Sequence, residues 1–66
     1  MKRFKVGDLV VDILGNILKV VETDEMWTWM KWVRKDGSLS DGCLGLLPSQ
    51  LAGYEELNVE GEENER

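Results

Sequence analysis

Two runs rich in β-branched residues, DLVVDIL at 8–14 and ILKVVET at 17–23, constrain the fold of this chain most. Such residues fit the pleated, half-buried surface of a sheet. Gly15 and Asn16 lie between the runs, and both residue types tolerate the positive φ that a tight hairpin turn requires. The first third of the chain is therefore predicted to form a β-hairpin, followed by a polar turn at 23–25.

A third strand is predicted over 26–35, where three tryptophans fall within six positions. Apolar residues also recur there with helical spacing, so a helix is the rival interpretation. The tryptophans, a threonine and a valine favour a strand. Asp36-Gly37, which follows directly, is a strong signal for a two-residue hairpin and favours a strand as well.

The segment after this hairpin is interrupted by glycines and a proline, so no regular helix of ten residues fits there. Pro48 is preformed for a first helical position, and PSQL at 48–51 therefore predicts one short helical turn. A brief last strand is expected within 52–57. The result is an all-β fold of about five short strands, which a body of this size would curl into a small, partly open barrel.

Composition limits the chemistry that the chain can perform. The 66 residues include no histidine and one cysteine, Cys43. These counts exclude an internal disulfide and argue against a zinc site. We expect neither catalysis nor a cofactor nor a bound metal, and we expect Cys43 to be a small, half-buried residue rather than a reactive thiolate.

The net charge of −5 is carried by the C-terminal end of the sequence. Residues 1–54 hold seven acidic and seven basic side chains, whereas 55–66 hold six glutamates against Arg66. We therefore predict a barrel domain over 1–54 and a flexible acidic tail over 55–66. The tail could be a solubilising terminus, or an acidic arm that docks on a basic partner or mimics nucleic acid.

No segment approaches the roughly 20 apolar residues that a membrane-spanning helix needs. The N-terminus is basic but lacks the apolar run of a signal peptide. A reduced, cytoplasmic setting without a membrane partner is expected.

The segment DGCLGLLPSQLAGYEEL resembles the C-terminal signature of Src-homology-3 domains. Gly42 and Gly45 match the glycines of that signature, Leu46 and Leu47 its apolar pair, and PS at 48–49 its Pro-Ser. FKVGDLV at 4–10 is similar to the Phe-x-x-Gly-Asp segment of these domains, and to the first strand of KOW and Tudor-like barrels and of small bacterial and phage barrel proteins. The resemblance implies a five-stranded Src-homology-3-like barrel with a short helical turn before its last strand.

The family's Ala-Leu-Tyr-Asp-Tyr strand, which supplies the aromatic floor of its peptide groove, is absent here. Leu51 also stands where the family signature has a tyrosine. The resemblance therefore extends to the fold and not to recognition of polyproline peptides.

The tryptophan strand is apolar on both of its faces. Alternation places Trp27 and Trp29 on one face and Met30 and Trp32 on the other. One face is expected to join a core of Val10, Leu18, Val20, Leu46 and Leu51. We expect one indole in the core and another in an exposed patch, and the predicted protein-binding residues are Trp27, Trp29, Trp32, Pro48 and Tyr54.

A small protein-interaction module, a regulator or inhibitor of a larger machine, is the function that these residues predict. One alternative is a KOW- or Tudor-like nucleic-acid-binding domain that uses Lys31, Arg34 and Lys35 beside the indoles. Another is an acidic competitor of a nucleic-acid-binding protein, acting through the tail. A homodimer formed through an edge strand or the aromatic patch is also left open.

Overall fold

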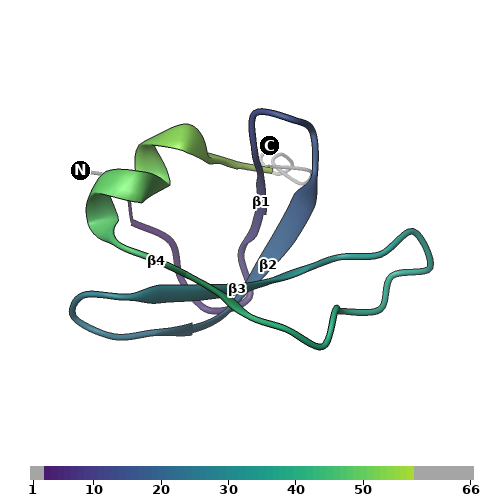
Figure 1. Cartoon of the computed structure of the whole chain (residues 1–66), viewed down its shortest axis with the longest axis horizontal. Coiled ribbons are helices and arrows are strands. Elements are labelled where there is room, and N and C mark those ends of the chain that lie inside the picture. Colours follow the sequence, from purple (N-terminus) through teal and green to yellow (C-terminus); the bar gives the residue numbers. More distant parts are fainter. Residues whose placement is uncertain (1–2, 58–66) are drawn as a thin grey trace, which may run out of the picture.

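The computed structural model of the protein describes residues 3–57. Its elements, in chain order, are β1 (Leu9–Val11), β2 (Ile17–Thr23), β3 (Thr28–Trp32), β4 (Leu44–Leu46), the 3₁₀ helix η1 (Pro48–Gly53) and β5 (Glu55–Glu56) (Figure 1). This confirms the all-β prediction, the number of strands and the short helical turn that begins at Pro48.

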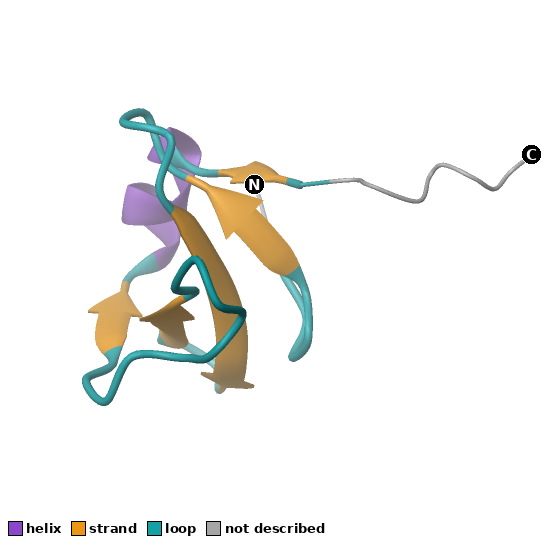
Figure 2. Ribbon diagram, turned by 90° about the vertical axis from the view of Figure 1, so that its right-hand side faces the viewer, coloured by secondary structure: helices purple, strands orange, loops and turns teal. Residues whose placement is uncertain are grey.

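The five strands form one antiparallel sheet in the order β4-β3-β2-β1-β5. The two outer strands, β4 and β5, are consecutive strands of the chain, and η1 connects them across one end of the sheet (Figures 1 and 2). The sheet is open, because its order runs from one outer strand to the other without a pairing between them.

The core lies on one face of this bent sheet. Its buried side chains come from every strand except β5, from η1 and from the segment before β1. Half-buried Leu44 and Tyr54 pack against it. All five predicted core residues are confirmed, and the structure adds two that were not predicted: the buried set is Phe4, Val10, Leu18, Val20, Met30, Leu46 and Leu51.

No tryptophan belongs to this core, although one indole was expected there. Thr28 and Met30 are the buried side chains of β3, with 8% and 0% of their surface exposed. The unbranched, flexible Met30 side chain fills the place in the core where an indole was expected.

A β-bulge at Val21 interrupts the pairing of β2 with β3. Val20 lies opposite Met30, but Glu22 lies opposite Trp29, so β2 carries one extra residue. A bulge of this kind bends its strand and increases the local twist. It also brings Glu22 to the same face of the sheet as Trp29.

Two predicted strands are shorter than their sequences suggested, because an aspartate turn takes up residues at one end of each: Asp12 after the first strand and Asp24 before the second. The run 8–14 leaves the sheet after Val11, where the Asp12 carboxylate accepts hydrogen bonds from the Leu14 and Asn16 amides, both at 2.9 Å. The run 26–35 is regular strand only over Thr28–Trp32. Asp36-Gly37 forms the predicted hairpin turn, with Gly37 at a φ of 89°, but its ladder is one isolated bridge between Val33 and Leu39.

The first residues of the predicted acidic tail, which begins at residue 55, belong to the sheet. Glu55 and Glu56 form β5 and pair with Val11 and Val10, because the outer edge of β1 would otherwise lack a partner. The Leu57 amide then donates to the Leu9 carbonyl at 2.7 Å. The rest of the predicted flexible tail, 58–66, lies outside the described residues.

Among residues 3–57, no helix has the length and apolar character that crossing a membrane would require.

Candidate functional site

The turn between β2 and β3 is held by one carboxylate. Asp24 Oδ1 accepts hydrogen bonds from the backbone amides of Met26 and Trp27, at 2.9 and 2.6 Å. The Asp24 amide in turn donates to the Trp27 carbonyl at 2.9 Å. The hydrogen bonds from the Trp27 and Met26 amides keep the pKa of Asp24 below its usual value, so the carboxylate is charged and the turn is rigid at neutral pH.

Trp27 and Trp29 stack on the outer face of the sheet, away from the core. Their ring centroids are 5.7 Å apart and their planes differ by 25°. Trp29 lies opposite Gly45 in β4, and a Cβ on that glycine would come within 2.5 Å of the indole ring. Gly45 therefore provides the flat surface on which Trp29 rests, and Trp29 in turn supports Trp27.

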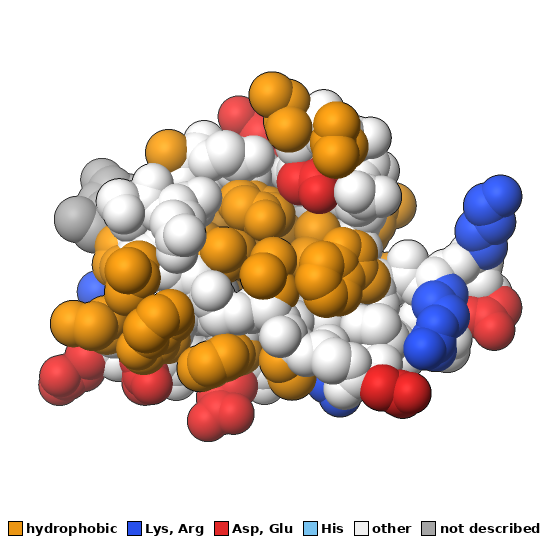
Figure 3. Space-filling view, in the orientation of Figure 1, with side chains coloured by type: hydrophobic (Ala, Val, Ile, Leu, Met, Phe, Trp, Pro, Cys, Tyr) orange, Lys and Arg blue, Asp and Glu red, His pale blue; other side chains and the backbone are white. Residues whose placement is uncertain are grey.

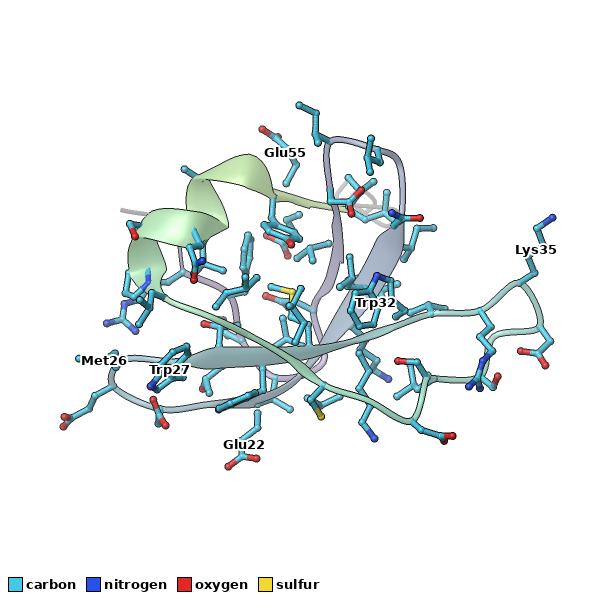
Figure 4. The ribbon with its side chains drawn as sticks, viewed as in Figure 1. Glu22, Met26, Trp27, Trp32, Lys35 and Glu55 are labelled. Carbon is cyan, nitrogen blue, oxygen red and sulfur yellow. The ribbon has the colours of Figure 1, made fainter. Side chains whose placement is uncertain are left out.

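Beside this stack, a groove runs between the Asp24 turn and the start of η1. Met26, Leu47 and Pro48 supply its apolar walls, and Glu25 and Ser49 complete it. Met26 is 58% exposed and Trp27 36% exposed. We call the set Met26, Trp27, Leu47 and Pro48 the Trp27 surface; Figures 3 and 4 show apolar side chains gathered at this end of the molecule, around the labelled Met26 and Trp27.

Acidic side chains border the Trp27 surface. Glu22, Asp24 and Glu25 are all exposed there, and Arg3 lines the adjoining pocket. The exposed cations Arg34 and Lys35 lie on the hairpin at the opposite end of the molecule (Figures 3 and 4). The apolar groove thus lies at an end of the protein with three exposed acids and Arg3, whereas the hairpin carries cations together with the exposed acids Asp36 and Asp41.

Trp32 lies apart from the other two indoles. It occupies the other end of β3, opposite Leu18, and 39% of its surface is exposed (Figure 4). Its backbone is tied to the hairpin, since the Trp32 amide donates to Ser40 Oγ at 3.0 Å and the Ser40 amide donates to the Trp32 carbonyl at 2.9 Å. Trp32 is on the core side of β3, at an open end of the sheet where the core does not cover it.

Tyr54 is half-buried against the core, just before β5. Burial raises the pKa of its phenol, and the negative charge of Asp12 raises it further. Tyr54 directly precedes β5, where Glu55 pairs with Val11, the last residue of β1. The structure therefore groups Trp27, Trp29 and Pro48 at one end of the protein, and assigns Trp32 and Tyr54 to other parts of it.

Sequence reasoning missed one exposed apolar pair. Ile13 and Leu14 lie at the tip of the Asp12 turn, 91% and 82% exposed. Because they continue a β-branched run, their sequence predicts the end of a strand. Asp12 is the signal that could have shown that these two residues belong to a turn and not to the strand. Its short acceptor side chain favours a turn over the hydrogen-bond ladder of a sheet.

The outer face of the sheet also carries a pair of cations next to the tryptophan stack. Lys19 in β2 lies directly opposite Lys31 in β3, and both are partly buried. Lys31 and Trp29 are two residues apart on the same strand and hence on the same face. Aromatic and cationic groups are adjacent there.

Within the part of the chain that the structure describes, no group of three or more His, Cys, Asp or Glu side chains is arranged to hold a metal ion. Cys43 is exposed rather than half-buried as expected, because it precedes β4 at the edge of the sheet.

The arrangement offers an apolar surface with acidic borders. No protein-family model, curated protein or solved structure matches this chain.

Proposed function

We propose that this chain is a non-enzymatic protein-interaction module with a Src-homology-3-like fold, and that it binds its partner through the Trp27 surface. The strand order β4-β3-β2-β1-β5 supports the fold, as does the 3₁₀ helix between β4 and β5. The Gly-Leu-Leu-Pro-Ser sequence at 45–49 leads into that helix at the position where the family signature has its own.

The observation that carries the proposal is an exposed indole held on a rigid support. Trp27 is fixed by the Asp24 turn on one side and by the Trp29 ring on the other. An interface anchor of this kind loses little conformational entropy when a partner covers it. Tryptophan is also enriched among the residues that dominate binding energy.

The acidic border favours a partner with basic residues around an apolar anchor point, because complementary charge speeds encounter and suppresses wrong partners. A module of this kind suits a regulator or inhibitor of a larger assembly, and the resemblance to small bacterial and phage barrels suggests such an origin in a cytoplasmic setting.

The test compares single alanine variants in binding to one partner. Proteins captured from a lysate by the immobilised full chain are identified, purified and titrated against wild type, Trp27→Ala and Ile13→Ala. Trp27→Ala should cost about 2 kcal/mol or more, roughly a 30-fold loss of affinity. Ile13→Ala, which changes an exposed apolar residue of another turn, should bind as wild type does.

Unchanged affinity of a folded Trp27→Ala variant would refute the site. A loss confined to Ile13→Ala would move the interface to the Asp12 turn, and a loss confined to Trp32→Ala would move it to the other end of β3.

Nucleic-acid binding is the second candidate, favoured by the Lys19–Lys31 pair beside Trp29 on one face. Lysines would contact phosphates and the indole would stack on a base. Retention on a single-stranded DNA or RNA column that falls steeply with salt would support it, and the absence of retention at low salt would exclude it.

A further inference from the structure

A row of residues crosses the outer face of the sheet from β3 to the end of the described chain. Lys31 lies opposite Lys19, and Lys19 lies opposite Leu9 in β1. The Leu57 amide then bonds the Leu9 carbonyl. The chain thus leaves the sheet in the same row that contains the two lysines.

The two lysines lack an acidic neighbour in this row. Among the described residues, their cross-strand neighbours are each other, Leu9 and, by the continued register of β4, Cys43. The acids Glu22 and Glu55 are on the same face but lie opposite Trp29 and Val11. Like charges directly opposite each other on a sheet are destabilising. Because the side chains are partly buried, their stems lie along the sheet and their charges stay close together.

The sequence that follows Leu57 has the charge that this row lacks. Residues 58–66 contain Glu60, Glu62, Glu63 and Glu65 against a single Arg66. Three strand spacings separate Leu57 from Lys31, about 14 Å in all. Nine residues can extend to about 30 Å, so these glutamates can reach both lysines.

We propose that the acidic segment 58–66 folds back over the outer face of the sheet and binds the Lys19–Lys31 pair as an intramolecular counter-charge. The segment then occupies the surface that a nucleic acid or an acidic protein would need. The contact is a partly populated one, because exposed ion pairs are individually weak and are screened by salt.

Cys43 allows a direct test on the full chain. It is exposed and is the only cysteine of the sequence. Leu44 pairs with Met30, so the same register continued by one residue brings Cys43 next to Lys31. A nitroxide attached to Cys43 should broaden the amide NMR signals of residues 60–65 at low salt, and added salt should remove the broadening.

Two double variants, each of which removes two positive charges, distinguish this contact from a general effect of net charge. Lys19→Gln with Lys31→Gln should abolish the broadening, whereas Arg34→Gln with Lys35→Gln, on the distant hairpin, should leave it in place. Replacing the four glutamates of the segment by glutamine should also abolish it. Unchanged amide shifts of Val10 and Leu18 would show that the core is intact in each variant.

The proposal is overturned if the wild-type segment shows no more broadening than the glutamine-substituted one, or if both lysine and hairpin variants reduce it equally. Broadening of an isotope-labelled chain by a nitroxide on a second chain would also overturn it, since the segment would then contact another copy. A segment that is broadened only when single-stranded RNA is absent would support the proposal and show that the two ligands share the lysines.

Discussion

At the scale of single residues, the placement of Trp29 depends on a neighbour with no side chain. Gly45 has no positive φ and is required for space alone, since an added Cβ would fall 2.5–2.9 Å from three atoms of the indole ring. Sequence inspection recognised Gly45 as part of a family-like signature. Its contact with Trp29 comes from the register between β3 and β4, which the predicted hairpin did not specify.

Gly45→Ala should therefore displace the Trp29 ring and weaken its stack with Trp27. Overpacking of this kind costs about 1–3 kcal/mol. Urea denaturation followed by near-ultraviolet circular dichroism measures both the loss of stability and the change around the indoles. Gly42→Ala is the matched control, because nothing lies within 4 Å of the added methyl group and stability should stay near that of the wild type.

At the scale of elements, three turns between strands are closed by aspartates that accept backbone hydrogen bonds, and Asp8 does the same for the Lys5 amide before β1. Asp12 bonds the Leu14 and Asn16 amides, Asp24 bonds the Met26 and Trp27 amides, and Asp36 bonds the Ser38 amide and hydroxyl. These bonds end the strands at positions that β-propensity alone does not indicate. They also keep the pKa of each of these three carboxyls below its ordinary value.

The Asp24 turn predicts a specific dependence of stability on pH. The pKa of Asp24 is lower in the folded protein than in the unfolded chain, where it is about 3.9, so ionised Asp24 stabilises the fold. That contribution is complete above about pH 5 and is lost as the pH falls through the folded pKa. The free energy of unfolding should therefore fall less steeply with acidification in Asp24→Asn than in wild type, as measured by urea titrations from pH 6 to pH 2.

Glu25→Gln provides the control for this measurement. It removes a carboxylate from the same turn without touching the Asp24 hydrogen bonds, so its pH profile should keep the slope of the wild type. Equal slopes for wild type and Asp24→Asn would contradict the role assigned to Asp24.

At the scale of the whole molecule, the fold depends on a small core. Within residues 3–57, seven buried apolar side chains support a sheet whose outer strands are β4 and β5. A chain of this length buries only about 60% of its unfolded surface, and its stability is small. Each core residue therefore contributes a large share of the protein's free energy of unfolding.

Met30→Ala and Trp32→Ala compare the core with the exposed end of the same strand. Met30 is fully buried, so its truncation should cost about 2–5 kcal/mol and come close to unfolding the protein. Trp32→Ala removes a larger side chain, but 39% of that side chain is exposed, and the cost should be smaller. Thermal unfolding of the two variants shows which substitution lowers the stability more. A greater loss of stability for Trp32→Ala would mean that its indole completes the core.

The sequence by itself determined the number of strands, the position of η1 and most of the core, because local propensity, alternation and turn residues act within a few positions of each other. Val10, Leu18, Val20, Leu46 and Leu51 could be predicted as core for that reason. Only the tertiary structure decided which face of the tryptophan strand is buried. Both faces are apolar, and the choice of Met30 over an indole depends on the volume that the curved sheet leaves, which no local pattern contains.

The same distinction applies to the candidate site. The sequence identified the tryptophans and Pro48 as unusual, but the separation of Trp32 and Tyr54 from Trp27 depends on strand register and on the bulge at Val21. The pairing of Lys19 with Lys31, and of β5 with β1, likewise joins residues far apart in the chain. Such contacts are set by the order and register of the strands in the sheet, a property of the whole fold.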